Sequence, residues 1–364
     1  MKSNFQLTLI LSLSFLLLNG CKKDNDDSDS PGFNQGELLV NWGNNIILPS
    51  YIEYAKAIGE FDALCQSISV NPSAQNLDLL KEAHNKAYLT WQAVSLFEFG
   101  PAESTLLRVN SNIYPCDTLG LNDKVLANEF DLSSASDLSK KGFPAIDYLL
   151  YSSQELSSQG RVDYLKTVSS ELKTNADVVL DSWSATGANY VSEFKETTGN
   201  DVGSSMGMVL NALTQHLEGF HREGKIGIPN GERSFSGTPL PEKVEGVFEA
   251  GHSVAYAIEN LKSIERIYLG TDLQGNDGIG LEENLNTIEA KYNGGSLDAE
   301  IKSQFAKTFE AYSKISTPLK DAVVNQSQQV SDVYKELQKL VVLFKADIPS
   351  SLGVLITYQD NDGD

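Results

Sequence analysis

The chain has 364 residues, with 28 lysines and arginines against 49 aspartates and glutamates, and a formal net charge of −21. This acidic balance excludes the basic surface typical of nucleic-acid-binding proteins, so we expect no nucleic-acid partner. Its 3 cysteines are too few for a disulfide-rich scaffold or a cysteine-based metal centre. The length suits one large domain or two domains of ordinary size.

Residues 1–20 have the pattern of an export signal peptide. Lys2 supplies the charged start, and an apolar run from Leu7 to Leu18 follows it. That run is shorter than the roughly 20 apolar residues of a permanent transmembrane helix. The sequence Leu18-Asn19-Gly20-Cys21 resembles the lipobox of bacterial lipoproteins, in which the cysteine thiol carries a lipid. We therefore expect Cys21 to anchor the chain to a membrane of the cell envelope, the outer membrane by preference; the alternative is an ordinary signal followed by an unrelated cysteine.

Residues 21–34 are charged or small, with a basic pair followed by aspartates. Such a segment buries no core, and we expect a flexible tether. A basic and then acidic run after the lipidated cysteine is also similar to the surface-export signal of Bacteroidetes lipoproteins. The tether therefore leaves open whether the protein faces the periplasm or the outside.

From residue 35 onward, apolar residues recur every three or four positions, which is typical of amphipathic helices. The helical stripes cover residues 51–68, 77–94, 165–183, 206–220, 247–264, 297–315 and 319–344. Helices of this length are typical of bundles, and no stretch alternates as an all-β domain would. The sequence predicts an all-α chain of two consecutive helical bundles, at 35–200 and 201–364.

A histidine and two cysteines carry separate expectations. His84 falls on an apolar stripe, one heptad before Trp91, and we expect it to be a hydrogen-bonded core histidine. Cys65 and Cys116 either form a disulfide, which an exported protein permits, or remain free.

Four segments together resemble the imelysin family, in its Bacteroidetes-type lipoprotein branch. They are residues 91–102 (Trp91 to Glu98-Phe99-Gly100-Pro101-Ala102), 141–150 (Lys141-Gly142-Phe143-Pro144-Ala145-Ile146-Asp147-Tyr148-Leu149-Leu150), 224–229 (Gly224-Lys225-Ile226-Gly227-Ile228-Pro229) and 351–360 (Ser351 to Asp360). The resemblance implies a bipartite all-helical fold of two four-helix-bundle-like domains related by a pseudo-twofold. It also implies a role in iron acquisition at the cell envelope, with iron or haem as the ligand and outer-membrane uptake proteins as partners. Members of the family were once classed as metallopeptidases.

The family signature is Gly-x-His-x-x-Glu, and the matching positions here are Gly142, Pro144 and Asp147. A histidine and a glutamate three apart project from one helix face and can hold a metal or a water. Pro144 removes the nitrogen ligand, although proline suits the first turn of a helix. Asp147 keeps a carboxylate near the helix N-terminus, where the dipole favours it. The segment is therefore either an altered ligand site or a plain helix start.

Other candidates for a ligand site lie near these segments. Trp91 and Tyr148 are candidate ligand-binding residues, and Lys225 and Arg233 are candidate anion-binding residues in a Gly/Pro-rich loop at 224–246. Each of them has a structural alternative, as a core aromatic or as the partner of a surface acid.

Metal binding has one further, weak pair of candidates in Glu218 and His221, which share a helix face. His216 and His221, five residues apart, would point about 140° away from each other on an α-helix. The structural alternative is a solvated, charged helix end without a metal.

The leading hypothesis is a non-enzymatic binding or accessory lipoprotein serving iron or haem acquisition. Its site would lie where the Gly142–Tyr148 helix start meets Trp91 and the loop after Gly224. The first alternative is a metallopeptidase of the imelysin type, which needs at least three metal ligands and a water. The second alternative is a structural lipoprotein that docks a partner. No Gly-x-Ser-x-Gly or phosphate-binding loop motif suggests another enzyme class.

Overall fold

A computed structural model describes residues 33–233 and 236–358. Residues from Phe33 onward form one compact unit. The predicted signal peptide, Cys21 and the tether up to residue 32 lie outside the described residues, so lipid attachment stays a prediction. None of the described helices is both long enough and apolar enough to cross a membrane.

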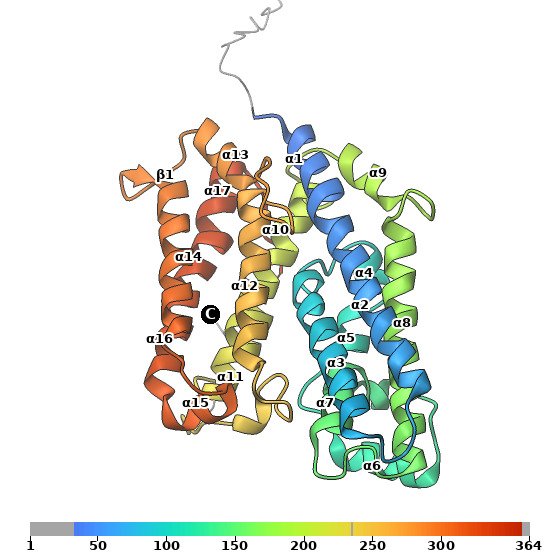
Figure 1. The fold of residues 1–364 in the computed structure, drawn as a ribbon. Helices are drawn as coiled ribbons and strands as arrows, with labels where there is room; N and C mark the ends of the chain where they lie inside the picture. The colour runs from blue at the N-terminus through green and yellow to red at the C-terminus, as the bar shows by residue number, and fades with distance from the viewer. Residues whose placement is uncertain (1–32, 234–235, 359–364) are drawn as a thin grey trace, which may run out of the picture. The chain divides into compact units, whose positions relative to one another are not determined.

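The first group of long helices comprises α2 (Leu48–Ser67), α3 (Ala74–Val94), α7 (Gly142–Tyr151) and α8 (Gln159–Trp183). Helix α2 packs against both α3 and α8, and α7 packs against α8 (Figure 1). Two elements, α1 (Gln35–Asn41) and η1 (Trp42–Ile47), lead directly into α2. Large aromatic side chains fill the space between these helices, because the stripes predicted from the sequence all face inward.

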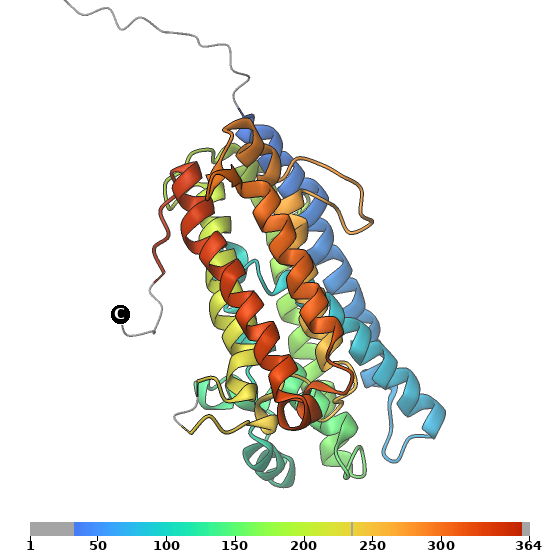
Figure 2. The ribbon, with the colours of Figure 1, turned by 90° about the vertical axis from the view of Figure 1, so that its left-hand side faces the viewer.

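The second group comprises α10 (Ser205–Gln215), η3 (His216–Gly227), α12 (Ser253–Leu269), α14 (Leu297–Ser313), α16 (Ser327–Val342) and η5 (Leu343–Asp347). Helix α14 packs against α16, and α16 packs against η3, as Figure 2 shows from the side of this group. Helix α12 packs against α14 and η3 within the group and against α3 of the first group. Helices α3 and α12 therefore form the junction between the two groups.

Short elements connect the long helices. They are α4 (Pro101–Ser104), α5 (Leu107–Ser111), α6 (Thr118–Ala127), η2 (Ala135–Lys140), α9 (Tyr190–Glu196), α11 (Ile228–Asn230), η4 (Pro241–Lys243), α13 (Leu281–Thr287), α15 (Leu319–Asn325) and α17 (Ile348–Leu352). A hairpin of β1 (Lys291–Tyr292) and β2 (Gly295–Ser296) is antiparallel. The prediction of an all-α chain is confirmed. The predicted domain boundary near residue 200 stays a prediction.

Two of the predicted helices have different bounds in the structure. The stripe at 247–264 begins too early, because Gly246 and Ala250 have positive φ angles of 68° and 59° and α12 starts at Ser253. The stripe at 319–344 is interrupted at Gln326, whose φ of −132° separates α15 from α16. Apolar spacing alone did not reveal either break.

Three π-helical segments share one local cause. Each of η1, η3 and η5 ends directly before a residue that is followed by proline, namely Pro49, Pro229 and Pro349. The residue before each proline donates its N–H to the carbonyl five residues back. Proline has no N–H, and its ring crowds the carbonyl four residues back, so the preceding turn widens to the π pattern.

The two described cysteines are not bonded to each other. Cys65 is buried on α2 and Cys116 lies partly buried before α6, and both are free thiols. The disulfide alternative is therefore wrong. Burial raises the pKa of the Cys116 thiol to about 12, so this thiol is protonated and unreactive at neutral pH.

Candidate functional site

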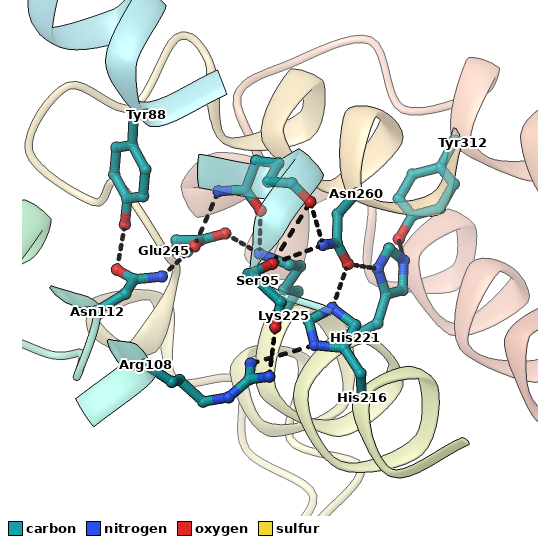
Figure 3. Close-up of polar contacts among 11 residues, drawn as sticks. Tyr88, Ser95, Arg108, Asn112, His216, His221, Lys225, Glu245, Asn260 and Tyr312 are labelled. Carbon is teal, nitrogen blue, oxygen red and sulfur yellow. Dashed lines mark hydrogen bonds and ion pairs between the residues drawn. The ribbon is translucent and has the colours of Figure 1, made fainter. Parts of the chain in front are cut away.

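Polar side chains gather at the junction of the two helix groups (Figure 3). They come from the end of α3, from α5 and the turn after it, from η3, from the loop before α12, and from α12 and α14. The cluster, called the junction network below, consists of Tyr88, Gln92, Ser95, Arg108, Asn112, His216, His221, Lys225, Glu245, Asn260 and Tyr312.

Asn260 on α12 is the centre of the junction network. Its side-chain Nδ2 donates to the carbonyl of Gln92 at 2.9 Å and to Oγ of Ser95 at 3.0 Å. Its Oδ1 lies 2.8 Å from Nε2 of His216 and 2.7 Å from Nδ1 of His221. Because the carbonyl of Gln92 can only accept, the amide orientation is fixed and Oδ1 must face the two histidines.

The tautomer of each histidine follows from Asn260. Both ring nitrogens that face its Oδ1 must carry hydrogen, which leaves Nδ1 of His216 and Nε2 of His221 as acceptors. Arg108 donates from Nη1 to the first at 3.1 Å, and the Tyr312 hydroxyl donates to the second at 2.8 Å. Every ring nitrogen of the two histidines is therefore engaged in a bond consistent with the neutral form.

Burial supports this neutral state. It lowers the pKa of His221 to about 3, against the favourable hydrogen bond to Asn260. It also places the pKa of His216 well below its ordinary value, and the neighbouring Arg108 charge acts in the same direction. Both rings are neutral at physiological pH.

A buried ion pair extends the junction network toward α3. The Lys225 ammonium contacts Oε2 of Glu245 and donates to Oε1 of Gln92 at 2.8 Å. Oε1 of Glu245 accepts from Asn112 at 2.6 Å and from Gln92 at 3.2 Å. Tyr88 donates to Oδ1 of Asn112 at 2.7 Å. Both charges of the pair are thus buried with additional hydrogen bonds, as buried ion pairs require.

Arg108 connects this network to the end of α3. Besides His216, its guanidinium contacts the carbonyl of Ser95 and lies 3.7 Å from the carboxylate of Glu98. The guanidinium also lies 3.8 Å from the ring centroid of Phe220, in a cation–π arrangement. The side chain is almost completely buried, so water screens its charge only weakly and each contact changes its electrostatic energy.

A small cavity of about 30 Å³ opens beside the network, lined by Trp91, Ser95, Arg108, Asn112, Tyr114, His216, Phe220 and Lys225. This space holds one or two water-sized groups. The two cations of the network, Arg108 and Lys225, both face it.

The Gly142–Asp147 segment does not reach this cavity but supports the loop that carries Glu245. Asp147 is buried on α7 and accepts the backbone N–H of Phe248 at 2.9 Å and of Glu249 at 2.8 Å. Burial raises the pKa of Asp147 to about 7, and the two backbone donors oppose that rise. Pro144 lies in the first turn of α7, where its missing N–H leaves no bond unmade.

Gly142 is required by the backbone at the start of α7. Its φ is +72°, and a Cβ would lie 2.1 Å from the carbonyl oxygen of Ser111. A side chain at this position would therefore meet both backbone strain and a direct clash. Of the three positions of the family signature, Gly142 and Pro144 shape the backbone at the start of α7, and Asp147 holds the loop that carries Glu245.

The other predicted site residues are dispersed. Trp91 and Lys225 both line the cavity. Tyr148 packs on Phe248 with ring centroids 5.1 Å apart and accepts a hydrogen bond from Asn122. Arg233 donates to Glu223 at 2.8 Å, in a separate cluster with Tyr334. The predicted site required Asp147, Lys225 and Arg233 to converge on one cleft. In the structure these three residues lie in separate places.

The metal candidates are also separated. Glu218 pairs with Lys345 at 2.9 Å, whereas His221 bonds Asn260 and Tyr312. Within the described residues, no three histidine, cysteine, aspartate or glutamate side chains are placed to hold a metal ion. The lone pairs of His216 and His221 are already taken by Arg108 and Tyr312, so neither ring is a free ligand. The residues of the junction therefore do not fit a resident metal.

His84 is buried as predicted but is not hydrogen-bonded. Its ring has no exposed surface, and neither nitrogen has a hydrogen-bond partner among residues 33–233 and 236–358. The rings of Phe61, Tyr88, Phe143 and Tyr151 surround it, with centroids between 5.6 and 6.1 Å away. Burial lowers the pKa of His84 to about 3, so the ring is neutral.

Most of the junction network was missed from the sequence. Four of its members lie on three different helices and one loop, and nothing in their sequence spacing connects them: Gln92, Arg108, Asn260 and Glu245. One signal was available in Pro229, because the turn before a proline tends to widen. The π-helical segment η3 that ends before Pro229 reaches back to His216. In a π-helix, residues five apart return to the same side, so the predicted 140° separation of the two histidines was wrong.

Comparison with known proteins agrees with this architecture. The imelysin family model, a peptidase family by its name, matches residues 47–345. Iron-regulated protein A of Synechococcus elongatus is 28% identical over 147 residues, which are 40% of this chain and 40% of that protein. The chain thus matches less than half the length of this curated relative.

Two crystal structures share the fold. One is described as an iron-regulated protein A precursor from Parabacteroides distasonis, with a TM-score of 0.71, 17% identity, and coverage of 87% of this chain and 95% of that one. The other is an imelysin-like protein from Psychrobacter arcticum, with a TM-score of 0.66, 19% identity, and coverage of 89% and 97%. By the family match over most of its length, the chain belongs to the imelysin family.

Proposed function

We propose that this chain is a non-enzymatic binding or accessory protein of the cell envelope that serves iron acquisition, held to a membrane by a lipid on Cys21. Three things support the proposal: membership of the imelysin family, similarity to a protein named for its iron regulation, and the lipobox-like sequence before Cys21. Outer-membrane uptake proteins are the partners we propose for it.

The junction network is the observation that carries the proposal. It places two buried cations, Arg108 and Lys225, around a small cavity at the contact between α3, η3 and α12. Its histidines are locked as neutral hydrogen-bonding groups by Asn260. A polar site whose side chains are already held by hydrogen bonds is suited to recognition.

An iron species suits this site better than haem. Pockets that enclose ligands of drug size measure roughly 300–1,000 Å³, and the junction cavity measures about 30 Å³. Haem is too large for that space. We therefore propose an iron complex that presents one small group to the cavity while its remainder stays outside.

The metallopeptidase alternative lacks support at the junction. A catalytic zinc site needs three protein ligands and a water, and the two junction histidines offer no free lone pair. Metal analysis of the purified protein decides between the proposals: stoichiometric zinc together with chelator-sensitive proteolysis would establish the peptidase.

The direct test uses the chain without residues 1–20 and with Cys21→Ser. Calorimetric titration with ferric complexes should give binding in the micromolar range, and a strain lacking the gene should grow poorly when iron is scarce. No binding of any ferric complex, together with normal growth on limiting iron, would refute the proposal. Restoration of growth by the full-length chain but not by its Cys21→Ser variant tests the anchor separately.

A further inference from the structure

The side-chain acceptors of Asn112 and His216 on the wall of the junction cavity, and of Glu245 directly behind it, already accept hydrogen bonds. Glu245 accepts on both carboxylate oxygens, from Gln92 and Asn112 on one and from Lys225 on the other. Nδ1 of His216 accepts from Arg108. A group that enters the cavity therefore finds few acceptors for its own hydrogens.

Donors remain on the same wall. The Lys225 ammonium has three N–H groups, of which Gln92 and Glu245 take two. The Arg108 guanidinium has five, and its buried Nε makes no hydrogen bond; the nearest carboxylate, that of Glu98, is 3.7 Å away. The hydroxyl of Tyr114 makes no hydrogen bond within the described part of the chain.

The charges and the volume of the cavity restrict the kind of group that can enter it. Arg108 and Lys225 are each accompanied by a carboxylate, from Glu98 and Glu245, so the wall is close to neutral before anything binds. A volume of about 30 Å³ admits one small group only. Phe220 is 38% exposed and lines the same cavity, which places an apolar surface beside its opening.

We propose that this cavity receives a carboxylate group of a small ligand, held by Arg108 and Lys225. A carboxylate is an acceptor on both oxygens and matches the planar fork of an arginine. The remainder of the ligand lies outside, against Phe220. The inference rests on the proposed function and gives it a ligand class: a carboxylate-bearing molecule, either as the free acid or as its iron complex.

Calorimetric titration of the chain from residue 21 with acetate, citrate, ferric citrate and phosphate tests the inference. We expect binding of citrate or ferric citrate, weak or no binding of phosphate, and at least a tenfold loss of affinity in Arg108→Gln. Preference for ferric citrate over citrate identifies the iron complex as the source of the carboxylate. Equal affinities of citrate and phosphate, or no binding of any carboxylate at millimolar concentration, would overturn it.

Variants that preserve the fold keep the test decisive. Tyr114→Phe removes one hydroxyl donor from the wall and should weaken binding severalfold. The pair Lys225→Met with Glu245→Gln removes both charges of the buried ion pair together, which leaves no unpaired charge. Lys335→Met removes the cation of an exposed ion pair, and Arg266→Gln removes that of a half-buried one; neither residue lines the cavity, so both variants should bind as the wild type does. Equal binding by Arg108→Gln and Arg266→Gln would contradict the inference.

The inference and the proposed function fail separately. Carboxylate binding that depends on Arg108, in a strain whose growth on limiting iron is normal without the gene, would retain the inference and refute the function. An iron-dependent growth defect that Arg108→Gln does not reproduce, with no carboxylate bound in vitro, would do the opposite.

Discussion

His216 and His221, five residues apart in η3, both face the same oxygen atom, Oδ1 of Asn260. The π winding before Pro229 makes this convergence geometrically available, because an α-helix would point the two rings in different directions. Asn260 thereby joins η3 to α3 through the carbonyl of Gln92. One amide side chain thus fixes the tautomers of two histidines and the contact between two helix groups.

Asn260→Asp should therefore destabilise the protein strongly. The substitution replaces the Nδ2 donor with a carboxylate oxygen, which would face the carbonyl of Gln92. The two hydrogen bonds that Nδ2 donates, to Gln92 and to Ser95, would be lost. Leaving such buried groups unsatisfied costs about 2–4 kcal/mol in the free energy of unfolding, which urea unfolding measures. Asn325→Asp, at the exposed last residue of α15, is the matched control and should change stability by less than about 0.5 kcal/mol. Similar effects of the two changes would show that Asn260 is not central.

Acid should destabilise the fold through its buried histidines. The pKa of His84 and of His221 is about 3 in the folded protein, against roughly 6.5 when unfolded. Between these values the unfolded chain binds more protons, so stability falls as pH falls below about 6.5. Each such histidine costs about 2 kcal/mol between pH 7 and pH 5.

His84→Phe isolates one of these contributions. The variant should lose about 2 kcal/mol less than the wild type between pH 7 and pH 5, measured by urea unfolding at both pH values. Asp147, whose pKa is raised to about 7, acts in the opposite direction, since its contribution falls as pH rises; it is present in both proteins and cancels. His84→Gln should show the same reduced pH dependence with lower stability at pH 7. An unchanged pH dependence in both variants would show that His84 titrates normally.

The helices were predictable because every helix of a bundle shows the same spacing of apolar residues. Each inward stripe needs an apolar residue every three or four positions, and the observed α3, α8 and α14 coincide closely with their predicted stripes. Breaks were less predictable, because they depend on single backbone angles. Ala250 adopts a positive φ, which is uncommon for alanine, and it separates Val247 from α12, although the apolar spacing joins the two into one stripe.

The site was less predictable than the helices for a different reason. The two residues at its cationic wall, Arg108 and Lys225, are 117 positions apart and meet only after the two helix groups pack. Lys225 was a candidate because it lies in a family-like segment. Arg108 lies in a short helix with no recognisable motif, and only the fold brings it to His216.

The start of α7 offers a sharp test of backbone geometry. Gly142→Ala places a Cβ at a φ of +72° and within 2.1 Å of the Ser111 carbonyl oxygen, so it should cost more than about 2 kcal/mol of unfolding free energy. Gly59→Ala, in the middle of α2 with no atom within 4 Å of the added Cβ, should stabilise by about 0.5–1 kcal/mol. Thermal unfolding of the two variants should therefore move in opposite directions. The same direction for both would show that Gly142 does not have the left-handed backbone.

Asp147→Asn tests how the helix start of α7 supports the loop that carries Glu245. Both carboxylate oxygens of Asp147 accept backbone N–H groups, whereas an amide has one acceptor and would turn its NH₂ toward the second donor. We expect a loss of about 1–3 kcal/mol and faster hydrogen exchange at the amides of Phe248 and Glu249. Asp277→Asn, at an exposed position, is the control. If the loop opens, Glu245 leaves Lys225 unpaired, so carboxylate binding at the junction should weaken although Asp147 does not line the cavity. Unchanged exchange at residues 244–252 would show that the loop is held by other contacts and that the family-signature position has no influence on the junction.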